Sequence, residues 1–322
     1  MNSPREILVI KPSSLGDVVH TLPAVALVKR HWPEARLRWL INPEWAPLLA
    51  GNPHVDEVVI FPRGQLRGIA GLMKIPAWAR QMGTRKADLV LDFQGLMRSA
   101  LIAKLCRAEG GRIVGLADAR EGSRLFYDQV ADVGGIAHAV DRYLALVDAL
   151  GIDSTAPLEW PLPAGNAPEG FSESEPFVLL HPFSRGVGKS LTPKEAATFC
   201  RELAPRRVVL AGRSRASVAP VENVTNLLNR TTIPELIWLI RRAAFVVSVD
   251  SGPMHIAAAL TPRLLSIHTW SDPRKVGPYQ PEAWVWKFAE LCQMKHFGQP
   301  AEHRRAAGLA EVAQHVAAQL GS

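Results

Sequence analysis

The sequence predicts an α/β fold made of two doubly wound domains, and three observations carry this prediction. Short apolar, β-branched segments alternate with longer segments of helical periodicity, which is typical of a parallel sheet with helices on both faces. The alternation starts twice, first at Glu6 and again at Phe177. Between the two series, residues 153–176 are rich in Pro, Gly, Ser and acidic residues, as linkers are.

The first series predicts a domain at residues 1–160, followed by a linker at 161–176. Strands are expected at residues 6–10, 36–41, 57–61, 88–93 and 112–115. Helices are expected at residues 17–31, 65–82, 95–107 and 138–150. A total length of 322 residues also agrees with two domains, since a domain typically has about 100–200 residues.

The second series predicts a domain at residues 177–322. Its strands are expected at residues 177–181, 207–211, 245–249 and 264–268. Its helices are expected at residues 192–203, 233–242, 252–260 and 302–320. The last of these helices has two alternative positions, on its own domain or packed back on the N-terminal one.

The composition indicates an ordinary globular protein, because 48% of the residues are hydrophobic and 21% are charged. Cys106, Cys200 and Cys292 are widely spaced and form no C-x-x-C pair, which argues against a zinc site or a disulfide framework. The N-terminal apolar run, residues 7–10, is too short for a signal peptide, and no stretch has the length of a membrane span. We therefore expect a cytoplasmic protein.

Positive charge is concentrated in one segment. The net charge is +7, and residues 63–112 contain ten Lys or Arg but only three acidic residues. Such a patch suggests an anionic lipid, a phosphorylated glycan or a nucleic acid as partner, although a solvated surface helix would look the same. No nucleic-acid-binding signature supports the last partner. Residues 65–82 mix apolar residues, Trp78 and basic residues, as an interfacial helix does, or as a helix packed on the first sheet.

Four polar segments follow predicted strands, where open α/β sheets bind their ligands. They cover residues 10–21, 92–99, 181–193 and 247–259. In the first, Gly16 and small residues allow close backbone approach, and Asp17 can take a proton from a hydroxyl or simply cap the helix. The second, with a glycine and polar residues, fits either a binding loop or an ordinary strand-to-helix turn.

The third and fourth segments suit phosphate groups. Ser184, Arg185 and Lys189 stand with two glycines in the third, which fits a diphosphate or a surface loop without a ligand. In the fourth, an apolar strand ends at Asp250 and a helix starts at once, so the helix N-terminus offers a second phosphate seat. His255 lies inside this helix and has either a binding or a structural role.

Taken together, these segments resemble glycosyltransferase family 9, the heptosyltransferases of lipopolysaccharide, over nearly the whole chain. The most specific parts are residues 11–17 and 248–255, whose order and separation match. Arg120 and Glu121, with residues 125–127, are similar to a family segment near the acceptor site. The resemblance implies a GT-B fold, in which two Rossmann-like doubly wound domains face each other across a cleft. The N-terminal domain would bind the acceptor and the C-terminal domain the nucleotide sugar.

The resemblance also implies an inverting transfer that needs neither a metal nor a cofactor. The donor would be a nucleotide-diphosphate sugar, commonly ADP-heptose. The acceptor would be an anionic glycolipid of the lipopolysaccharide-core type, met at the inner face of the inner membrane. By matching position, Asp17 would be the catalytic base, assisted by Lys11. The implied donor-binding residues are Ser184, Lys189, Asp250, Ser251, Gly252 and His255. The implied acceptor-binding residues are Ser14, Gly16, Gln94, Arg98 and Arg120.

The sequence departs from the family pattern at two places. Leu191 stands where the family often has a tryptophan, and residues 212–216 lack the glutamate that some members use to bind the donor ribose. Arg213 and Arg215 make this loop basic instead. Two alternatives remain open at this stage: a nucleotide-sugar epimerase of similar fold and a non-catalytic sugar-nucleotide sensor.

Overall fold

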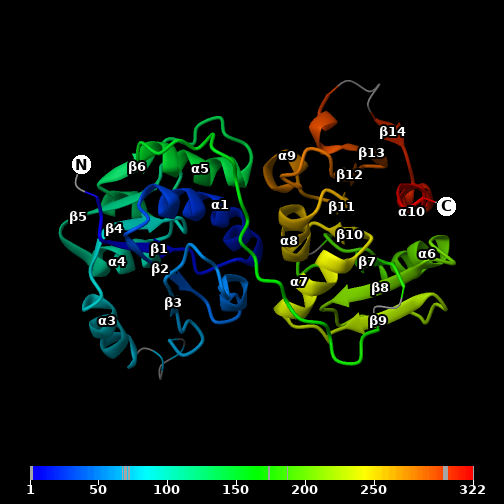
Figure 1. The fold of residues 1–322 in the computed structure, drawn as a ribbon, viewed down its shortest axis with the longest axis horizontal. Coiled ribbons are helices and arrows are strands. Elements are labelled where there is room, and N and C mark those ends of the chain that lie inside the picture. The colour runs from blue at the N-terminus through cyan, green and yellow to red at the C-terminus, as the bar shows by residue number, and fades with distance from the viewer. Residues whose placement is uncertain are drawn as a thin grey trace. The chain divides into compact units, whose positions relative to one another are not determined.

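The computed structural model describes residues 3–66, 68, 71, 73–172, 175–186, 188–299 and 304–321. The chain divides into two compact units, Met1–Pro163 and Ala164–Ser322, and each is built around its own sheet (Figure 1). This arrangement confirms the predicted α/β fold with two Rossmann-like domains.

The first unit contains a six-stranded parallel sheet. From edge to edge its strands are β3 (Glu57–Ile60), β2 (Arg36–Ile41), β1 (Glu6–Ile10), β4 (Ala87–Asp92), β5 (Arg107–Leu116) and β6 (Gln129–Ala131). This 3-2-1-4-5-6 order is that of dinucleotide-binding sheets. The helices are α1 (Leu15–His31), α3 (Ile75–Gly83), α4 (Met97–Cys106) and α5 (Ala139–Ala149), with 3-10 turns at Ala46–Leu49 and Ser123–Phe126.

Two helix pairs cover the first sheet. α1 packs with α5, and α3 packs with α4. Alternate residues of a strand point to opposite faces, so Leu8 and Ile10 of β1 share one buried cluster with Ile102 and Cys106 of α4. The central strands are buried on both faces and are therefore almost wholly apolar.

The second unit repeats the same strand order and extends it. The eight strands are β14 (Arg305–Ala306), β13 (Glu290–Gln293), β12 (Trp284–Lys287), β11 (Leu264–His268), β10 (Phe245–Val249), β7 (Phe177–His181), β8 (Arg207–Gly212) and β9 (Val224–Leu228). The six strands from β12 to β9 are parallel, whereas β13 and β14 add an antiparallel edge. The helices are α6 (Pro193–Glu202), α7 (Ile233–Arg242), α8 (Gly252–Leu260), α9 (Pro273–Val276) and α10 (Leu309–Gln319), with a 3-10 turn at Met294–His296.

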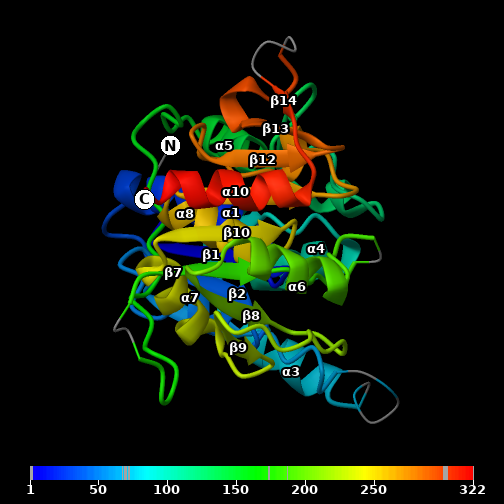
Figure 2. The ribbon, with the colours of Figure 1, turned by 90° about the vertical axis from the view of Figure 1, so that its right-hand side faces the viewer.

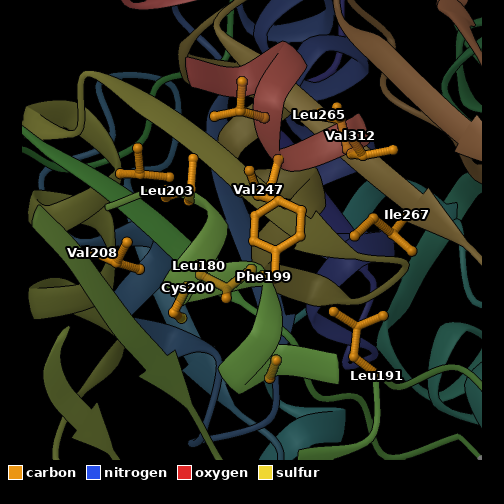
Figure 3. Packing of buried hydrophobic residues seen from close by; sticks show 14 of the residues in the cluster. Leu180, Leu191, Phe199, Cys200, Leu203, Val208, Val247, Leu265, Ile267 and Val312 are labelled. Atoms are coloured by element: carbon orange, nitrogen blue, oxygen red, sulfur yellow. The ribbon is translucent and has the colours of Figure 1, made fainter. Parts of the chain in front are cut away.

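One hydrophobic cluster of the second unit lies between its sheet and the helices α6 and α10, which run side by side (Figure 2). Phe199 of α6 stands among Val247, Leu265 and Ile267 of the central strands (Figure 3). Val312 of α10 completes this cluster. The apolar face of the last helix is therefore buried against the sheet and α6 of its own unit.

The expected linker, residues 161–176, belongs mostly to the second unit. The Phe171 ring packs at 5.5 Å from Phe177 and 5.9 Å from Trp238, centroid to centroid. Gly165, at φ +75°, approaches so closely that a Cβ there would come within 2.2 Å of the Pro234 carbonyl oxygen. Gly165 and Phe171 of this segment therefore pack against α7.

Several element boundaries differ from the sequence expectation. The last helix starts at Leu309 and not at residue 302, because Gly308 is its N-cap and Arg305–Ala306 forms the edge strand β14. The helix expected at residues 65–82 is observed as α3 from Ile75, while Arg67, Ile69, Ala70 and Leu72 lie outside the described residues. No helix in the described part of the chain is long and apolar enough to cross a membrane.

Candidate functional site

Each sheet has one place where the strand order reverses, and the four polar segments lie at these two places. In the first unit the order reverses between β1 and β4, where Ile10 pairs with Asp92. In the second unit it reverses between β7 and β10, where His181 pairs with Ser248. Loops that follow such neighbouring strands diverge and leave a crevice in which α/β proteins bind ligands. Each unit therefore contributes one half-site.

Asp17 dominates the first half-site. Its Oδ2 accepts hydrogen bonds from the backbone N–H of Ser14 at 2.9 Å and from the Ser14 hydroxyl at 2.7 Å. Asp17 thus caps α1, as one interpretation of the sequence predicted. Its other oxygen, Oδ1, lies 3.4 Å from the Tyr143 hydroxyl. The Ser14 cap and the Tyr143 hydroxyl thus contact different oxygens of this carboxylate. Gly16, in the same turn, is buried.

Lys11 is a buried cation behind this carboxylate. Its side chain is only 4% exposed, its Nζ donates to the Phe93 carbonyl at 2.9 Å, and the same atom lies 4.9 Å above the Tyr143 ring. Burial lowers the pKa of Lys11, and the negative charges of Asp17 and Asp92 oppose this shift. Lys11 therefore joins the ends of β1 and β4 and supplies positive charge near Asp17.

Asp92 is fully buried and shapes the loop after β4. It accepts hydrogen bonds from the backbone N–H groups of Gln94 at 2.9 Å and Gly95 at 3.1 Å. It also accepts from the hydroxyls of Ser99 at 2.8 Å and Tyr127 at 2.7 Å. Burial raises the pKa of Asp92, while these donors act in the opposite direction. With four donors on its two oxygens, Asp92 serves as a structural clamp.

Among the expected acceptor-binding residues, Gln94 lies in the loop after β4, Arg98 in the first turn of α4 and Arg120 in the loop after β5, and hydrogen bonds join these segments. The Arg120 N–H donates to the Gly95 carbonyl at 2.8 Å, and the Met97 N–H donates to the Glu121 carboxylate at 3.1 Å. The side chains of Arg98 and Arg120 are exposed, whereas Gln94 is half-buried. The structure thus brings two arginines and an amide to one rim of the first half-site.

An ion pair forms the centre of the second half-site. Lys189 Nζ donates to Asp250 Oδ2 at 2.7 Å, with the two side chains 26% and 6% exposed. Burial acts to raise the pKa of Asp250, but hydrogen bonds from Lys189 and Ser271 outweigh it and hold the pKa below its ordinary value. His255 Nε2 lies 4.0 Å from Asp250 Oδ1. Asp250 therefore lies next to two other residues that the sequence analysis singled out, Lys189 and His255.

The loop that carries Lys189 is held closed by short-range hydrogen bonds. The Ser184 N–H donates to the Ser190 hydroxyl at 2.8 Å, which in turn donates to the Ser184 carbonyl at 3.2 Å. The Thr269 hydroxyl donates to the Gly188 carbonyl. The Lys189–Asp250 hydrogen bond places the loop at the end of β10, and α8 begins directly after it at Gly252. This combination of a lysine and a helix N-terminus suits a diphosphate.

His181, at the end of β7, lies next to Ser251, the N-cap residue of α8. The Ser251 hydroxyl lies 3.3 Å from His181 Nδ1 and donates to the Val249 carbonyl at 3.1 Å. Complete burial lowers the pKa of His181 to about 4, so its ring is neutral at physiological pH. Gly212, at φ +125°, allows this packing, because a Cβ there would come within 2.7 Å of His181 Nε2.

Some residues at the two half-sites had no signal in the sequence motifs. Tyr143 comes from α5, 126 positions from Asp17. Tyr127, by contrast, lies in the segment 125–127 that the family resemblance had indicated. Trp270, which follows β11, is 72% exposed, and Lys189 Nζ lies 5.5 Å above its ring. Leu191, at the family's tryptophan position, is buried in the core instead. An isolated tryptophan after a predicted strand was the only available hint to Trp270.

The residues that the structure describes contain no group of three or more His, Cys, Asp or Glu side chains arranged for a metal ion. All three cysteines are buried thiols. Burial raises the pKa of Cys106 to about 11 and that of Cys200 to about 12, so both remain protonated and unreactive.

Comparison with known proteins agrees with this geometry. The sequence profile of glycosyltransferase family 9 (heptosyltransferase) matches residues 75–304. The lipopolysaccharide core heptosyltransferase OpsX of Haemophilus influenzae is 22% identical, over 93% of this chain and 89% of its own length. Lipopolysaccharide heptosyltransferase 1 of Pseudomonas aeruginosa is 29% identical, over 85% of this chain and 81% of its own length. The structure of E. coli heptosyltransferase WaaC with ADP superposes with a TM-score of 0.76 at 22% identity, over 98% of this chain and 99% of that one.

Proposed function

The chain belongs to glycosyltransferase family 9, the heptosyltransferases, and from this premise we propose that it moves heptose from ADP-heptose onto an anionic glycolipid of the lipopolysaccharide-core type. The resemblance predicted from its motifs is thereby confirmed, and so is its class as a glycosyltransferase. We further propose that the transfer inverts the anomeric centre and proceeds without a metal. The observation that carries the proposal is the Lys189–Asp250 ion pair beside the N-terminus of α8.

The second unit is the proposed donor site. Asp250 holds Lys189 in place before the donor arrives, so little side-chain freedom is lost on binding. Lys189 and the N–H group of Gly252 then contact the diphosphate, while Ser251 and His255 line it. As the bond between the anomeric carbon and the diphosphate oxygen breaks, negative charge grows on the leaving group. A fixed cation and a helix N-terminus stabilise this charge most in the transition state.

The first unit is the proposed acceptor site, with Asp17 as general base. Asp17 Oδ1 takes the proton of an acceptor hydroxyl, whose oxygen attacks the anomeric carbon from the side opposite the diphosphate. The Tyr143 hydroxyl orients this carboxylate, and burial together with the charge of Asp17 raises the pKa of Tyr143, so Tyr143 stays protonated. Lys11 balances the local charge. We assign Ser14, Gly16, Gln94, Arg98 and Arg120 to acceptor binding.

The nucleoside part of the donor meets an unusual loop after β8. This loop has no carboxylate for a ribose; instead, Asn229 braces it through hydrogen bonds of 3.0 and 2.8 Å to the backbone of Ser214. Arg213 and Arg215 lie in the same loop. The relatives' names point to ADP-heptose, and thermal shifts with ADP, UDP and GDP would test this choice, because the preferred nucleotide gives the largest stabilisation.

The proposed acceptor is anchored in a membrane, so we place the reaction at the cytoplasmic side of the inner membrane, with the protein in peripheral contact. This placement follows from the acceptor's chemistry and from the excess of basic residues between positions 63 and 112.

The decisive test replaces Asp17 by Asn. An asparagine oxygen still accepts from the Ser14 N–H, so α1 keeps its cap, but the amide cannot take a proton. We expect kcat to fall by about 10²–10⁴-fold, the usual contribution of a general base, with an unchanged Kd for ADP. Asp17→Ala should show the same loss of kcat plus about 1 kcal/mol of lost stability from the missing cap. An Asp17→Asn enzyme with wild-type kcat would rule out Asp17 as the base.

A further inference from the structure

An open apolar pocket lies between α3 and α4 of the first unit. Its volume is about 460 Å³, and its walls include Phe61, Ile75, Trp78 and Leu101. The Phe61 and Trp78 rings pack at 5.4 Å, centroid to centroid, and form a rigid floor. None of these four residues has a part in the proposed chemistry, so the pocket requires a separate explanation.

Large apolar residues in and near the pocket wall are partly exposed to solvent. Leu101 is 52% exposed and Ile75 is 38% exposed, although both are large aliphatic residues. α3 buries only Met82, and Met73 just before the helix is 80% exposed. The apolar face of a surface helix normally packs against the core, whereas several apolar residues of α3 line this pocket instead. Contiguous exposed apolar surface of this kind marks a ligand or membrane contact.

Two cations stand at the same pocket. Arg63 and Arg98 both contribute to its walls. They belong to the segment between residues 63 and 112, in which ten basic residues outnumber three acidic ones. Guanidinium groups bind phosphate through paired, charge-assisted hydrogen bonds. The combination of an apolar floor and arginines therefore complements a molecule that joins a hydrocarbon chain to a phosphate.

We propose that this pocket binds one acyl chain of a phosphorylated glycolipid, with the phosphate held by Arg63 and Arg98. A volume of 460 Å³ suits one small ligand and is too small for a lipid with several chains. Arg98 also stands in the first turn of α4, directly after the loop that carries Gln94. The proposal rests on the proposed function where it identifies this lipid with the sugar acceptor, and the pocket would then hold the acceptor's lipid end.

Binding can be measured without any transfer reaction. Linear monoalkyl phosphates of increasing chain length, each kept below its micelle concentration, are titrated into the full-length protein by calorimetry. We expect Kd to fall by about four-fold for each added methylene, the free energy of burying one such group, until the pocket is full. Inorganic phosphate should bind far more weakly. An affinity that does not depend on chain length would overturn the proposal.

Two variants locate the binding. Leu101→Gln makes a partly exposed wall polar, and Ala79→Leu fills the pocket. Each should weaken the longest alkyl phosphate by at least about ten-fold, the loss of two buried methylenes. Phe288→Gln is the matched control, because it removes a 75%-exposed aromatic ring from the second unit and should change nothing. Equal binding by wild type and both pocket variants would refute the assignment.

A transfer assay separates the pocket from the proposed function. Leu101→Gln should raise KM for the acylated acceptor but leave KM unchanged for the same acceptor after deacylation. If the enzyme transfers heptose to no acceptor while alkyl phosphates still bind, the proposed function is wrong but the proposed acyl-chain pocket is supported. If vesicles of anionic phospholipid bind wild type and Leu101→Gln alike while alkyl phosphates do not bind, the segment is a membrane-surface contact and the pocket proposal fails.

Discussion

Replacing Lys189 by Met tests how much the second half-site depends on its ion pair. The change keeps the aliphatic stem of the side chain but removes the cation that donates to Asp250 at 2.7 Å. Asp250 is only 5% exposed, so its carboxylate would remain buried without its main partner. Removing one partner of a buried ion pair costs about 3–5 kcal/mol. Lys189 is 26% exposed and His255 lies near, so the lower end of that range, about 3 kcal/mol, applies here.

Thermal unfolding measures this loss directly. For a unit of this size, each kcal/mol lowers Tm by about 2–4 °C, so the expected drop is about 6–12 °C at neutral pH. Without Lys189, burial becomes the largest influence on the pKa of Asp250 and should raise this pKa above the value in the unfolded chain. The folded variant then binds more protons than the unfolded chain just above that value, so acidification recovers part of the stability.

A double-mutant cycle supplies the control. Asp250→Asn removes the buried charge, and in that background the Lys189→Met change should cost much less than in wild type. The Lys189→Met variant should also bind ADP more weakly, since it lacks the cation that we propose contacts the diphosphate. The reasoning is refuted if Lys189→Met unfolds at the wild-type temperature, or if Asp250→Asn leaves its cost unchanged.

Two further predictions concern the packing around His181. Gly212→Ala should lower Tm by several °C more than Gly51→Ala. Both backbones have positive φ, worth about 1–3 kcal/mol of strain, but only the Cβ at position 212 would approach His181, to 2.7 Å. Equal losses of Tm in the two variants would contradict the close approach. Because burial lowers the pKa of His181 from 6.5 to about 4, the unfolded chain takes up a proton between these values and the folded one does not, so stability should fall with decreasing pH by about 1.4 kcal/mol per unit. Urea unfolding of His181→Gln should show a slope reduced by that amount, and an unchanged slope would exclude His181 as a source.

The central strands could be predicted from the sequence because both faces of each are buried. Such strands are continuous apolar runs between polar ends, and β1, β2, β7, β10 and β11 start and end where the sequence placed them. The edge strands lack this pattern. β9 is only half-buried, and β14 has two exposed residues.

The hairpin between β12 and β13 illustrates a second limit. Its turn residues are Phe288 and Ala289, both with positive φ of 51° and 59°. Turns of this kind usually contain Asn-Gly or Asp-Gly, so the sequence offered no turn signal. Tertiary packing of the strands overrides the local preference here.

At the half-sites, the sequence located individual residues better than their partners. Lys11 and Asp250 directly follow apolar strands, whereas Asp17 and Lys189 lie further along the polar segments after such strands. The Lys189–Asp250 contact joins residues 61 positions apart, and no linear pattern indicates such a pair. Tyr143 approaches Asp17 from another helix across 126 positions, so it could not be found without the fold.

The repetition of one strand order in two units has an evolutionary consequence. Each unit folds around its own core, and each of the two proposed substrates is assigned to only one of them. We therefore expect substitutions at the proposed nucleotide site to leave the packing beneath the proposed glycolipid site unchanged, and the reverse. Descendants of such a protein can change donor and acceptor one at a time, without passing through an unstable ancestor.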